Sequence, residues 1–207
     1  MLDGYNTQRR QEEERITEEA MVQAEAALEE PALVIAGRDW NQGVIGIVAS
    51  RLVEKYHKPT LVLCADGDTL KGSGRSISGF DLHAGLARCA DDLVTFGGHR
   101  MAAGVRVLPE KLGDFRAHFI DVVRGELGSD PVPAVQLIDG ELDFGTATNF
   151  IFLKELEMMQ PFGVGNPEPV FQSPPLLVKR RRLFGPQKNH VLLELTDESC
   201  NVTLQAK

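Results

Sequence analysis

The stretch PTLVLCADGDTLKGSGRSI, residues 59–77, decides the fold. Residues 59–67 are an apolar run that ends in a glycine turn, which is typical of a buried strand. Residues 69–77 follow as a second strand pattern, with glycines beside Arg75. Strands need a hydrophobic cover on at least one face, so the segments around this stretch are expected to supply it.

Strand and helix patterns alternate on both sides of this stretch. Short apolar runs predict strands, and apolar residues at helical spacing predict helices that begin at Pro or end at Gly. We expect strands over residues 32–37 and 104–108, and helices over residues 44–56, 81–96 and 109–128. This order of elements indicates an α/β domain over residues 32–128.

A long helix is predicted before this domain. Residues 7–29 contain no Gly or Pro and are rich in Ala, Glu, Gln and Arg, which favours a helix that ends before Pro31. Its apolar stripe is thin and consists of Ile16, Ala20, Ala24 and Ala27 or Leu28. Such a stripe cannot anchor a core by itself, so we interpret residues 1–31 as a connector helix that is solvated or bridges two domains.

The pattern changes after the α/β domain. Residues 129–135 have the composition of a linker, and one helix is predicted over residues 148–163. The remaining segments alternate between strand patterns and turn signals, as in a small β-barrel. We therefore expect a linker and a partial barrel over residues 129–207. The sequence begins on an acidic helix and ends inside an apparent strand, so we expect a piece of a longer protein.

Composition and charge narrow the choice of partner. The chain has 207 residues, an apolar fraction of 43% and a net charge of −8. Residues 1–31 carry 3 Lys and Arg against 9 Asp and Glu, whereas residues 32–128 carry 12 against 11. The α/β domain can therefore present a local basic surface to phosphate groups despite the negative total. No segment has the length and hydropathy of a membrane span, so no membrane partner is expected.

Cysteine use favours a reducing compartment. Cys64, Cys89 and Cys200 are far apart, odd in number and without a CxxC pair. This pattern argues against a disulfide framework and against a zinc site. No secretory signal opens the sequence, so we expect a cytoplasmic protein.

Three clusters in the α/β domain combine glycine with polar residues. They are RDWNQGVIGIVASR at 38–51, GSGRS at 72–76 and GGHR at 97–100. A helix N-terminus, a guanidinium group and backbone N–H groups beside glycine are each suited to an anion. The candidate phosphate-binding residues are Asn41, Arg51, Gly74, Arg75, Ser76, Gly97, Gly98 and His99.

Each cluster also has a purely structural interpretation. Gly97 is expected to end the helix over 81–96 in the left-handed conformation, GSGRS is a tight turn, and NQG is a turn before a helix. Three such clusters at element junctions of one domain favour a shared site, because junctions at one sheet edge of an α/β fold can converge.

A further polar cluster lies in the predicted barrel. Residues 178–185, VKRRRLFG, place the cations Lys179, Arg180, Arg181 and Arg182 on a predicted strand. Alternation sends Lys179 and Arg181 to one face, and Arg180 and Arg182 to the other. These cations are either a charged edge that discourages aggregation or a groove for single-stranded nucleic acid.

The sequence lacks the common motifs for metal sites, nucleotide-binding P-loops and serine nucleophiles. It contains no HExxH, P-loop or GxSxG motif, and no set of Asp and His with the spacing of a two-metal site. We therefore predict no metal ligand and no catalytic residue in this chain.

Four segments, in order along the chain, resemble the RecJ-type single-strand-specific DNA exonucleases of the DHH phosphoesterase superfamily. They are WNQGVIGIVASRLVEKYHKPT (40–60), KGSGRSISGFDLH (71–83), FGGHRMAAGV (96–105) and QPFGVGNPEPVF (160–171). The second and third are characteristic of the DHH-associated domain, and the fourth marks the entry into an OB-like barrel. Asn41 stands where members of this family commonly have His, and Asn can donate a hydrogen bond but cannot carry a charge.

The resemblance implies an exonuclease that degrades single-stranded DNA from the 5′ end in repair and recombination. Its catalytic domain would precede this region and bind Mg²⁺ or Mn²⁺, with the metal ligands outside this chain. Arg75, Ser76, Gly98 and His99 would then face the DNA backbone or a terminal phosphate. The implied partners are single-stranded DNA, the catalytic domain of the same protein and a single-strand-binding protein.

Three functional hypotheses follow for this chain. The first is the substrate-binding part of such an exonuclease, and the second is part of a phosphodiesterase for cyclic dinucleotides or short oligonucleotides. The third is a module without enzymatic activity that docks a replication or repair partner. The predicted barrel favours the first over the second, because an enzyme for small substrates has no evident need of it.

Overall fold

The computed structural model describes residues 2–128, 132–163, 165–185, 188, 190–197 and 203–206. Cys200 and residues 129–131 of the expected linker lie outside these ranges. The chain divides into two compact units, residues 1–134 and residues 135–207. The long N-terminal helix therefore belongs to the same unit as the α/β domain.

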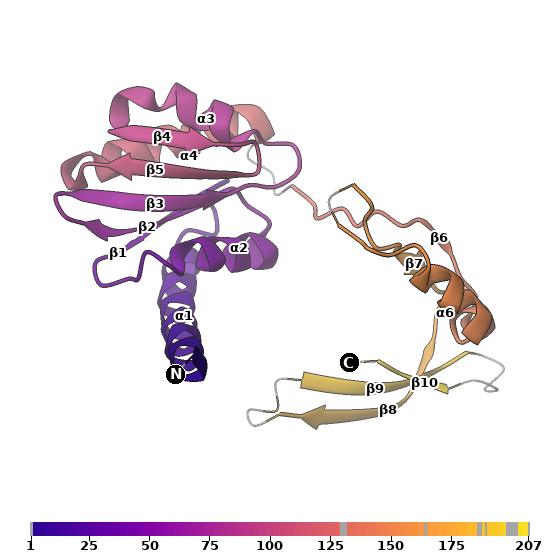
Figure 1. The fold of residues 1–207 in the computed structure, drawn as a ribbon. Helices are drawn as coiled ribbons and strands as arrows, with labels where there is room; N and C mark the ends of the chain where they lie inside the picture. Colours follow the sequence, from indigo (N-terminus) through magenta and orange to yellow (C-terminus); the bar gives the residue numbers. More distant parts are fainter. Residues whose placement is uncertain are drawn as a thin grey trace. The chain divides into compact units, whose positions relative to one another are not determined.

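A five-stranded mixed sheet organises the first unit (Figure 1). Its strands are β1 (Leu33–Gly37), β2 (Thr60–Asp66), β3 (Thr69–Arg75), β4 (Thr95–Gly98) and β5 (Ala102–Val107). Their order in space is β1-β2-β3-β5-β4. β1 and β2 run parallel, so a crossover helix joins them, and the other neighbouring strands run antiparallel.

Helices lie on both faces of this sheet (Figure 1). One face is covered by α3 (Leu82–Arg88) and α4 (Leu112–Leu127). The short 3₁₀ turn η1 (Ala90–Asp92) follows α3, and the turn η2 (Pro109–Lys111) precedes α4. The other face carries α1 (Leu2–Glu25) and the crossover helix α2 (Ile45–Tyr56). Each face has its own hydrophobic core.

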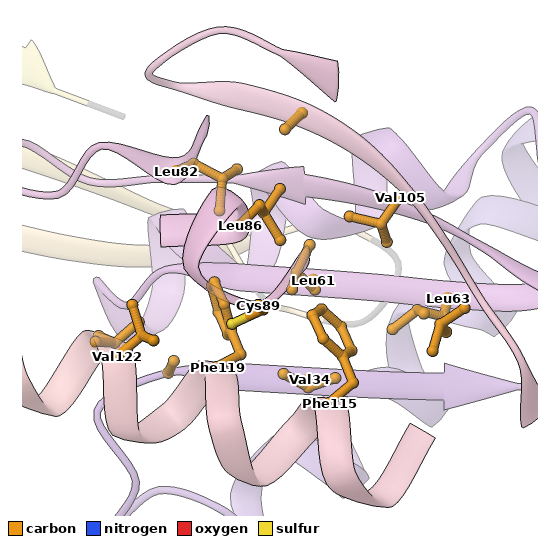
Figure 2. Packing of buried hydrophobic residues seen from close by; sticks show 14 of the residues in the cluster. Val34, Leu61, Leu63, Leu82, Leu86, Cys89, Val105, Phe115, Phe119 and Val122 are labelled. Carbon is orange, nitrogen blue, oxygen red and sulfur yellow. The ribbon is translucent and has the colours of Figure 1, made fainter. Parts of the chain in front are cut away.

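The first core lies between the sheet and the pair α3 and α4. Phe115 and Phe119 of α4 are fully buried and point toward Val34, Leu61 and Leu63 of the sheet (Figure 2). The two phenyl rings lie against each other, with centroids 6.0 Å apart. Aromatic side chains of this size dominate the stability of such a layer, because each removes a large apolar area from water.

The second core joins α1 and α2 to the opposite face. Ile16, Ala20 and Ala24 of α1 are fully buried. The expectation of a solvated or bridging helix is therefore wrong for the second half of α1, which packs into the first unit. The thin stripe suffices because α2 and β1 supply the larger side chains of this core, such as Leu52 and Ile35.

Polar contacts also tie α1 to the segment before α2. Trp40 Nε1 donates to Glu19 Oε2 at 2.8 Å, and Arg15 donates to the carbonyl oxygen of Asp39 at 3.3 Å. The pKa of Glu19 lies below its usual value of 4.5, because Trp40 and Arg15 donate to the carboxylate. The loop that precedes α2 is thus fixed to the N-terminal helix.

The helix predicted over residues 81–96 is shorter in the structure. α3 ends at Arg88, and β4 begins only at Thr95. Within β4, Gly97 pairs with Gly104 of β5 and does not have a positive φ, so it ends no helix. Val94 and Thr95 are β-branched, and pairing with β5 outweighs the helical spacing of the apolar residues before them.

The second unit contains short helices and two small sheets. Its elements are β6 (Gly140–Glu141), α5 (Phe144–Ala147), α6 (Phe150–Glu157), β7 (Phe171–Gln172), β8 (Leu177–Phe184), β9 (His190–Thr196) and β10 (Thr203–Ala206). β8, β9 and β10 form an antiparallel sheet, and β6 pairs with β7 in parallel. The described strands do not close into a barrel. α6 ends at Glu157, before residue 163, where the prediction placed the end of this helix. Pro161 disfavours a helical conformation of the residue before it, so the helix could not have continued through residue 160.

Two further properties concern the described residues as a whole. None of the helices among them is long and apolar enough to cross a membrane.

Cys64 and Cys89 are buried free thiols. Burial raises the pKa of Cys89 to about 11, so its thiol is protonated at neutral pH.

Candidate functional site

β3 separates its side chains by face. Gly72 and Gly74 face the core under α3 and α4, where a Cβ on them would lie 2.6 Å and 2.7 Å from the nearest core side chains. Lys71, Ser73 and Arg75 alternate with these glycines and lie on the opposite face. One strand therefore gives close packing to the core and a row of polar side chains to the other face.

A groove opens on this polar face where the helical cover ends. The core beneath α1 and α2 contains residues of β1 and β2 but none of β4 or β5. The groove has a volume of about 480 Å³ and is lined by the start of α2, the loop before it, and β3, β4 and β5. Its polar lining side chains are Gln42, Lys71, Ser73 and Arg75.

Small residues leave the floor of the groove bare. Gly104 of β5 lies in register between Ser73 of β3 and Gly97 of β4, and both glycines are exposed. The nearest atom to a Cβ at Gly104 would be a carbonyl oxygen 3.8 Å away. At the edge, Gly98 has a φ of +143°, and a Cβ there would lie 2.5 Å from the Ala102 carbonyl oxygen. Glycine is required at Gly98 for the backbone, whereas at Gly104 it keeps the floor open.

Arg75 presents its guanidinium group to the groove. Its Nη1 donates to the carbonyl oxygen of Gly74 at 2.8 Å and to Ser73 Oγ at 3.3 Å. Gly46 of α2 lets the group lie close to the helix, since a Cβ there would be 3.3 Å from Arg75 Nη2. Within the described part of the chain Arg75 forms no ion pair. Its charge and remaining N–H donors are available to an anion.

The structure places the other residues predicted from GSGRS away from the groove. Ser76 is buried, and its hydroxyl donates to the carbonyl oxygen of Phe80 at 2.9 Å. Gly74 faces the core, so it serves packing and not the approach of a ligand. The prediction treated the residues of GSGRS as one cluster, although the strand expected over residues 69–77 sends its residues to alternate faces, as β3 does up to Arg75.

The residues of the GGHR cluster lie at the end of a hairpin. Gly98 lines the groove, and Gly97 lies on the strand beside its floor. His99 is exposed in the turn that joins β4 to β5, where its backbone N–H donates to the carbonyl oxygen of Ala102 at 2.8 Å. The side chain of His99 is not among the groove's lining residues.

The residues predicted around α2 have structural partners. Asn41 is exposed, and its Oδ1 accepts a hydrogen bond from the Gly43 N–H at 2.8 Å, which shapes the loop. Arg51 forms an ion pair with Glu13 of α1, so its guanidinium is engaged away from the groove. Gln42, between Asn41 and Gly43, is the residue of this loop whose side chain lines the groove.

The lining residues absent from the predicted set include Gln42, Gly46, Lys71 and Ser73. Strand alternation contained the signal for two of them, because a strand that places Arg75 on one face places Ser73 and Lys71 there as well. No sequence signal distinguished Gln42 from Asn41, since both side chains are polar and lie in the same loop.

The cations of the second unit lie on β8. All described side chains of β8 are exposed. Arg180 and Arg182 line a shallow hollow of about 120 Å³ together with Leu192, Glu194 and Gln205, which agrees with the predicted alternation. A bulge between Val178 and Arg180 leaves Lys179 out of the strand pairing, and Arg181 pairs with Leu193. These cations remain candidate DNA contacts.

The described residues do not fit a catalytic metal ion. Among them, no three His, Cys, Asp or Glu side chains come together as a ligand set. Metal chemistry is therefore not assigned to the groove.

Comparisons with known proteins place the chain in a family. Residues 29–125 match the DHHA1 domain, and residues 138–206 match the RecJ OB domain. The chain is 35% identical over 204 residues to the single-stranded-DNA-specific exonuclease RecJ of Bacillus subtilis, a match that covers 96% of this chain and 25% of that protein. The protein of the same name from Escherichia coli is 33% identical over 204 residues, with 93% and 35% covered.

Solved structures agree with these matches. RecJ from Thermus thermophilus in complex with Mn²⁺ superposes with a TM-score of 0.78 and 28% identity, over 99% of this chain and 29% of that chain. The Mg²⁺ complex of that protein gives a TM-score of 0.76 and 29% identity, over 99% and 31%. The chain thus spans about a quarter to a third of the length of these relatives. It belongs to the RecJ family, of which it contains the DHHA1 and OB domains.

Proposed function

We propose that this chain is the substrate-binding part of a metal-dependent exonuclease that degrades single-stranded DNA from its 5′ end in DNA repair and recombination. The names of its relatives support the substrate and the reaction. The proposal concerns a longer protein, since the chain spans only part of the relatives' length.

The groove of the first unit carries this proposal. Arg75 faces it without a carboxylate partner among the described residues, and Ser73 offers a hydroxyl beside it. The glycine floor allows a phosphodiester backbone to approach the sheet closely. We assign Arg75 and Ser73 to one phosphate group. His99 follows Gly98 at the edge of the groove, and its exposure supports a phosphate contact there.

We infer that Mg²⁺ or Mn²⁺ is held by residues other than those described. Structures of RecJ in complex with each ion support the use of a divalent metal in the complete enzyme. The described residues contain no ligand cluster, which supports a catalytic site elsewhere. The chain should therefore bind single-stranded DNA without hydrolysing it when Mn²⁺ is added.

We propose that the second unit also binds single-stranded DNA. Arg180 and Arg182 share one face of the sheet, although Glu194 lies directly opposite Arg180 and offsets part of its charge. OB folds bind about 4–16 nucleotides, so this unit favours long strands over cyclic dinucleotides. Affinities of the chain for a dodecathymidylate and for a cyclic dinucleotide compare these two substrate classes.

Replacement of Arg75 tests the proposed function. Binding of a labelled dodecathymidylate is measured by fluorescence anisotropy at several salt concentrations. Arg75→Ala should weaken binding and reduce the salt slope by about 0.7, the value for one phosphate contact on a single strand. Arg88→Ala is the matched control, because Arg88 lies on α3, on the other face of the sheet, and pairs with Glu126. Equal effects of the two variants would contradict the proposal, and no effect of Arg75→Ala would favour a partner-docking module.

The proposal includes a location and a protein partner. The buried free thiols Cys64 and Cys89 support a reducing compartment such as the cytoplasm. We also propose that a single-strand-binding protein is among the partners, on the ground that both proteins would occupy the same DNA. Co-elution of the chain with a purified single-strand-binding protein tests this contact.

A further inference from the structure

Lys71 has no role in the proposed function, although it lies in the same groove as Arg75. Lys71, Ser73 and Arg75 occupy alternate positions of β3 on the groove face. Alternate residues of a strand are roughly 6.6 Å apart, which is close to the spacing of consecutive phosphates in an extended single strand. Since Arg75 Nη1 lies 3.3 Å from Ser73 Oγ, these two side chains reach one position, and Lys71 lies about one phosphate spacing beyond Ser73.

A series of polar contacts holds Lys71 in position. Its Nζ donates to Gln42 Oε1 at 3.3 Å, and Gln42 Nε2 donates to Asp66 Oδ1 at 2.8 Å. Asp66 in turn forms an ion pair with Arg106 at 2.6 Å. Arg106 is fixed by a hydrogen bond to Thr69 Oγ1 at 3.0 Å. The lysine is thus oriented by side chains from the loop before α2 and from the neighbouring strands.

The charges in this series leave Lys71 positive toward the groove. The pKa of Asp66 lies below its usual value of 3.8, because Gln42 and Arg106 donate to its carboxylate. Asp66 is therefore ionised at neutral pH and is balanced by Arg106. The ammonium group of Lys71 is exposed and has two N–H donors beyond the one given to Gln42.

We propose that Lys71 binds a second phosphate, one nucleotide along the strand from the phosphate held by Arg75 and Ser73. Gln42 is its positioning residue. The inference rests on the proposed function, because it requires that a strand occupies the groove. Its ligand is a single strand with two consecutive phosphates, and the contact does not depend on the base.

Two small probes separate the two phosphate positions. Thymidine 5′-monophosphate has one phosphate, and 5′-phosphorylated dithymidylate has two consecutive ones. Their affinities for the chain are measured by competition against a labelled dodecathymidylate. Lys111→Ala serves as the matched control, because Lys111 is an exposed lysine in η2 that faces Asp114.

We expect Lys71→Ala to leave the affinity for the monophosphate unchanged and to weaken the dinucleotide about two- to fivefold, as for an exposed ion pair. The salt slope for the dodecathymidylate should fall by about 0.7. Lys71→Arg should retain the slope, and Gln42→Ala should weaken the dinucleotide but not the monophosphate. Arg75→Ala should weaken both probes.

The outcomes distinguish this inference from the proposed function. If Arg75→Ala weakens both probes while Lys71→Ala changes neither affinity nor slope, the second phosphate position is overturned and the groove remains. If Lys71→Ala weakens the monophosphate as much as the dinucleotide, Lys71 shares the first position and the inference is wrong. If Arg75→Ala changes nothing, the proposed function itself fails.

Discussion

A side chain added to the floor of the groove separates binding from folding. Gly104→Val places a branched side chain between Ser73 and Gly97 on the exposed face of the sheet. The atom nearest to the new Cβ is a carbonyl oxygen at 3.8 Å, which is an ordinary contact. Glycine weakens a strand by roughly 0.5–1 kcal/mol, whereas β-branched residues favour the strand conformation. The variant should therefore unfold no more easily than the parent chain.

Gly72→Ala is the matched control on the neighbouring strand. Its Cβ points to the opposite face, where it would lie 2.6 Å from Val105 Cγ2 and 3.0 Å from Leu63 Cγ. This overpacking should destabilise the first unit by about 1–3 kcal/mol, while the groove remains open. The two glycines thus differ in which property of the protein they support.

Urea denaturation and anisotropy on a labelled dodecathymidylate measure the two properties. Trp40 is the single tryptophan and is buried in the first unit, so its fluorescence reports the unfolding of that unit. Gly104→Val should weaken binding by at least about tenfold, or 1.4 kcal/mol, at full stability. Gly72→Ala should lower the free energy of unfolding and leave the affinity for the dodecathymidylate unchanged. A stable Gly104→Val variant that binds as tightly as the parent chain would refute the assignment of the groove as the binding site.

Three further predictions follow from individual contacts. Ser73→Ala should weaken DNA binding without loss of stability. Ser76→Ala loses the buried hydrogen bond to the Phe80 carbonyl, so it should lower the free energy of unfolding by about 1 kcal/mol and leave DNA binding unchanged. Identical effects of the two variants in both assays would contradict the placement of the two hydroxyls. The pKa of Glu19 is lowered mainly by the hydrogen bond from Trp40, so the ionised Glu19 carboxylate contributes to the free energy of unfolding above about pH 4.5 and loses this contribution as the pH falls below that value. Trp40→Phe should therefore reduce the pH dependence of urea unfolding in that range, and an unchanged dependence in a circular-dichroism titration would count against this contact. Cys64 and Cys89 should resist alkylation at pH 8 until urea unfolds the first unit, as peptide mass spectrometry can show, and rapid labelling of the native chain would be inconsistent with their burial.

Sequence patterns anticipated most elements of the first unit but not its fourth strand. The apolar runs at 32–37 and 59–67 became β1 and β2, because buried strands leave a strong signal in sequence. The start of β4 was taken as the end of the helix predicted over residues 81–96, with Gly97 as the residue that ends it. Its identity depends on pairing with β5, a contact between segments that no local pattern reveals.

The sequence singled out Arg75, which the structure places in the groove, but it did not separate the neighbouring residues by the face they occupy. Glycine-rich strands are ambiguous, because a glycine can serve close packing or ligand approach, and the sequence does not state which face it occupies. Gly74 and Gly104 illustrate the two cases. The partner of the Ser76 hydroxyl could not be foreseen, because the carbonyl oxygen that accepts it lies four residues further on, in the irregular segment before α3.

We propose that Arg75 and Ser73 hold a phosphate of single-stranded DNA above the glycine floor. A crystal of the chain soaked with 5′-phosphorylated dithymidylate tests it most directly. We expect a phosphate within hydrogen-bond distance of the Arg75 guanidinium and the Ser73 hydroxyl, with the strand running over Gly104. A dinucleotide bound with full occupancy elsewhere, while an accessible groove contains only solvent, would contradict it.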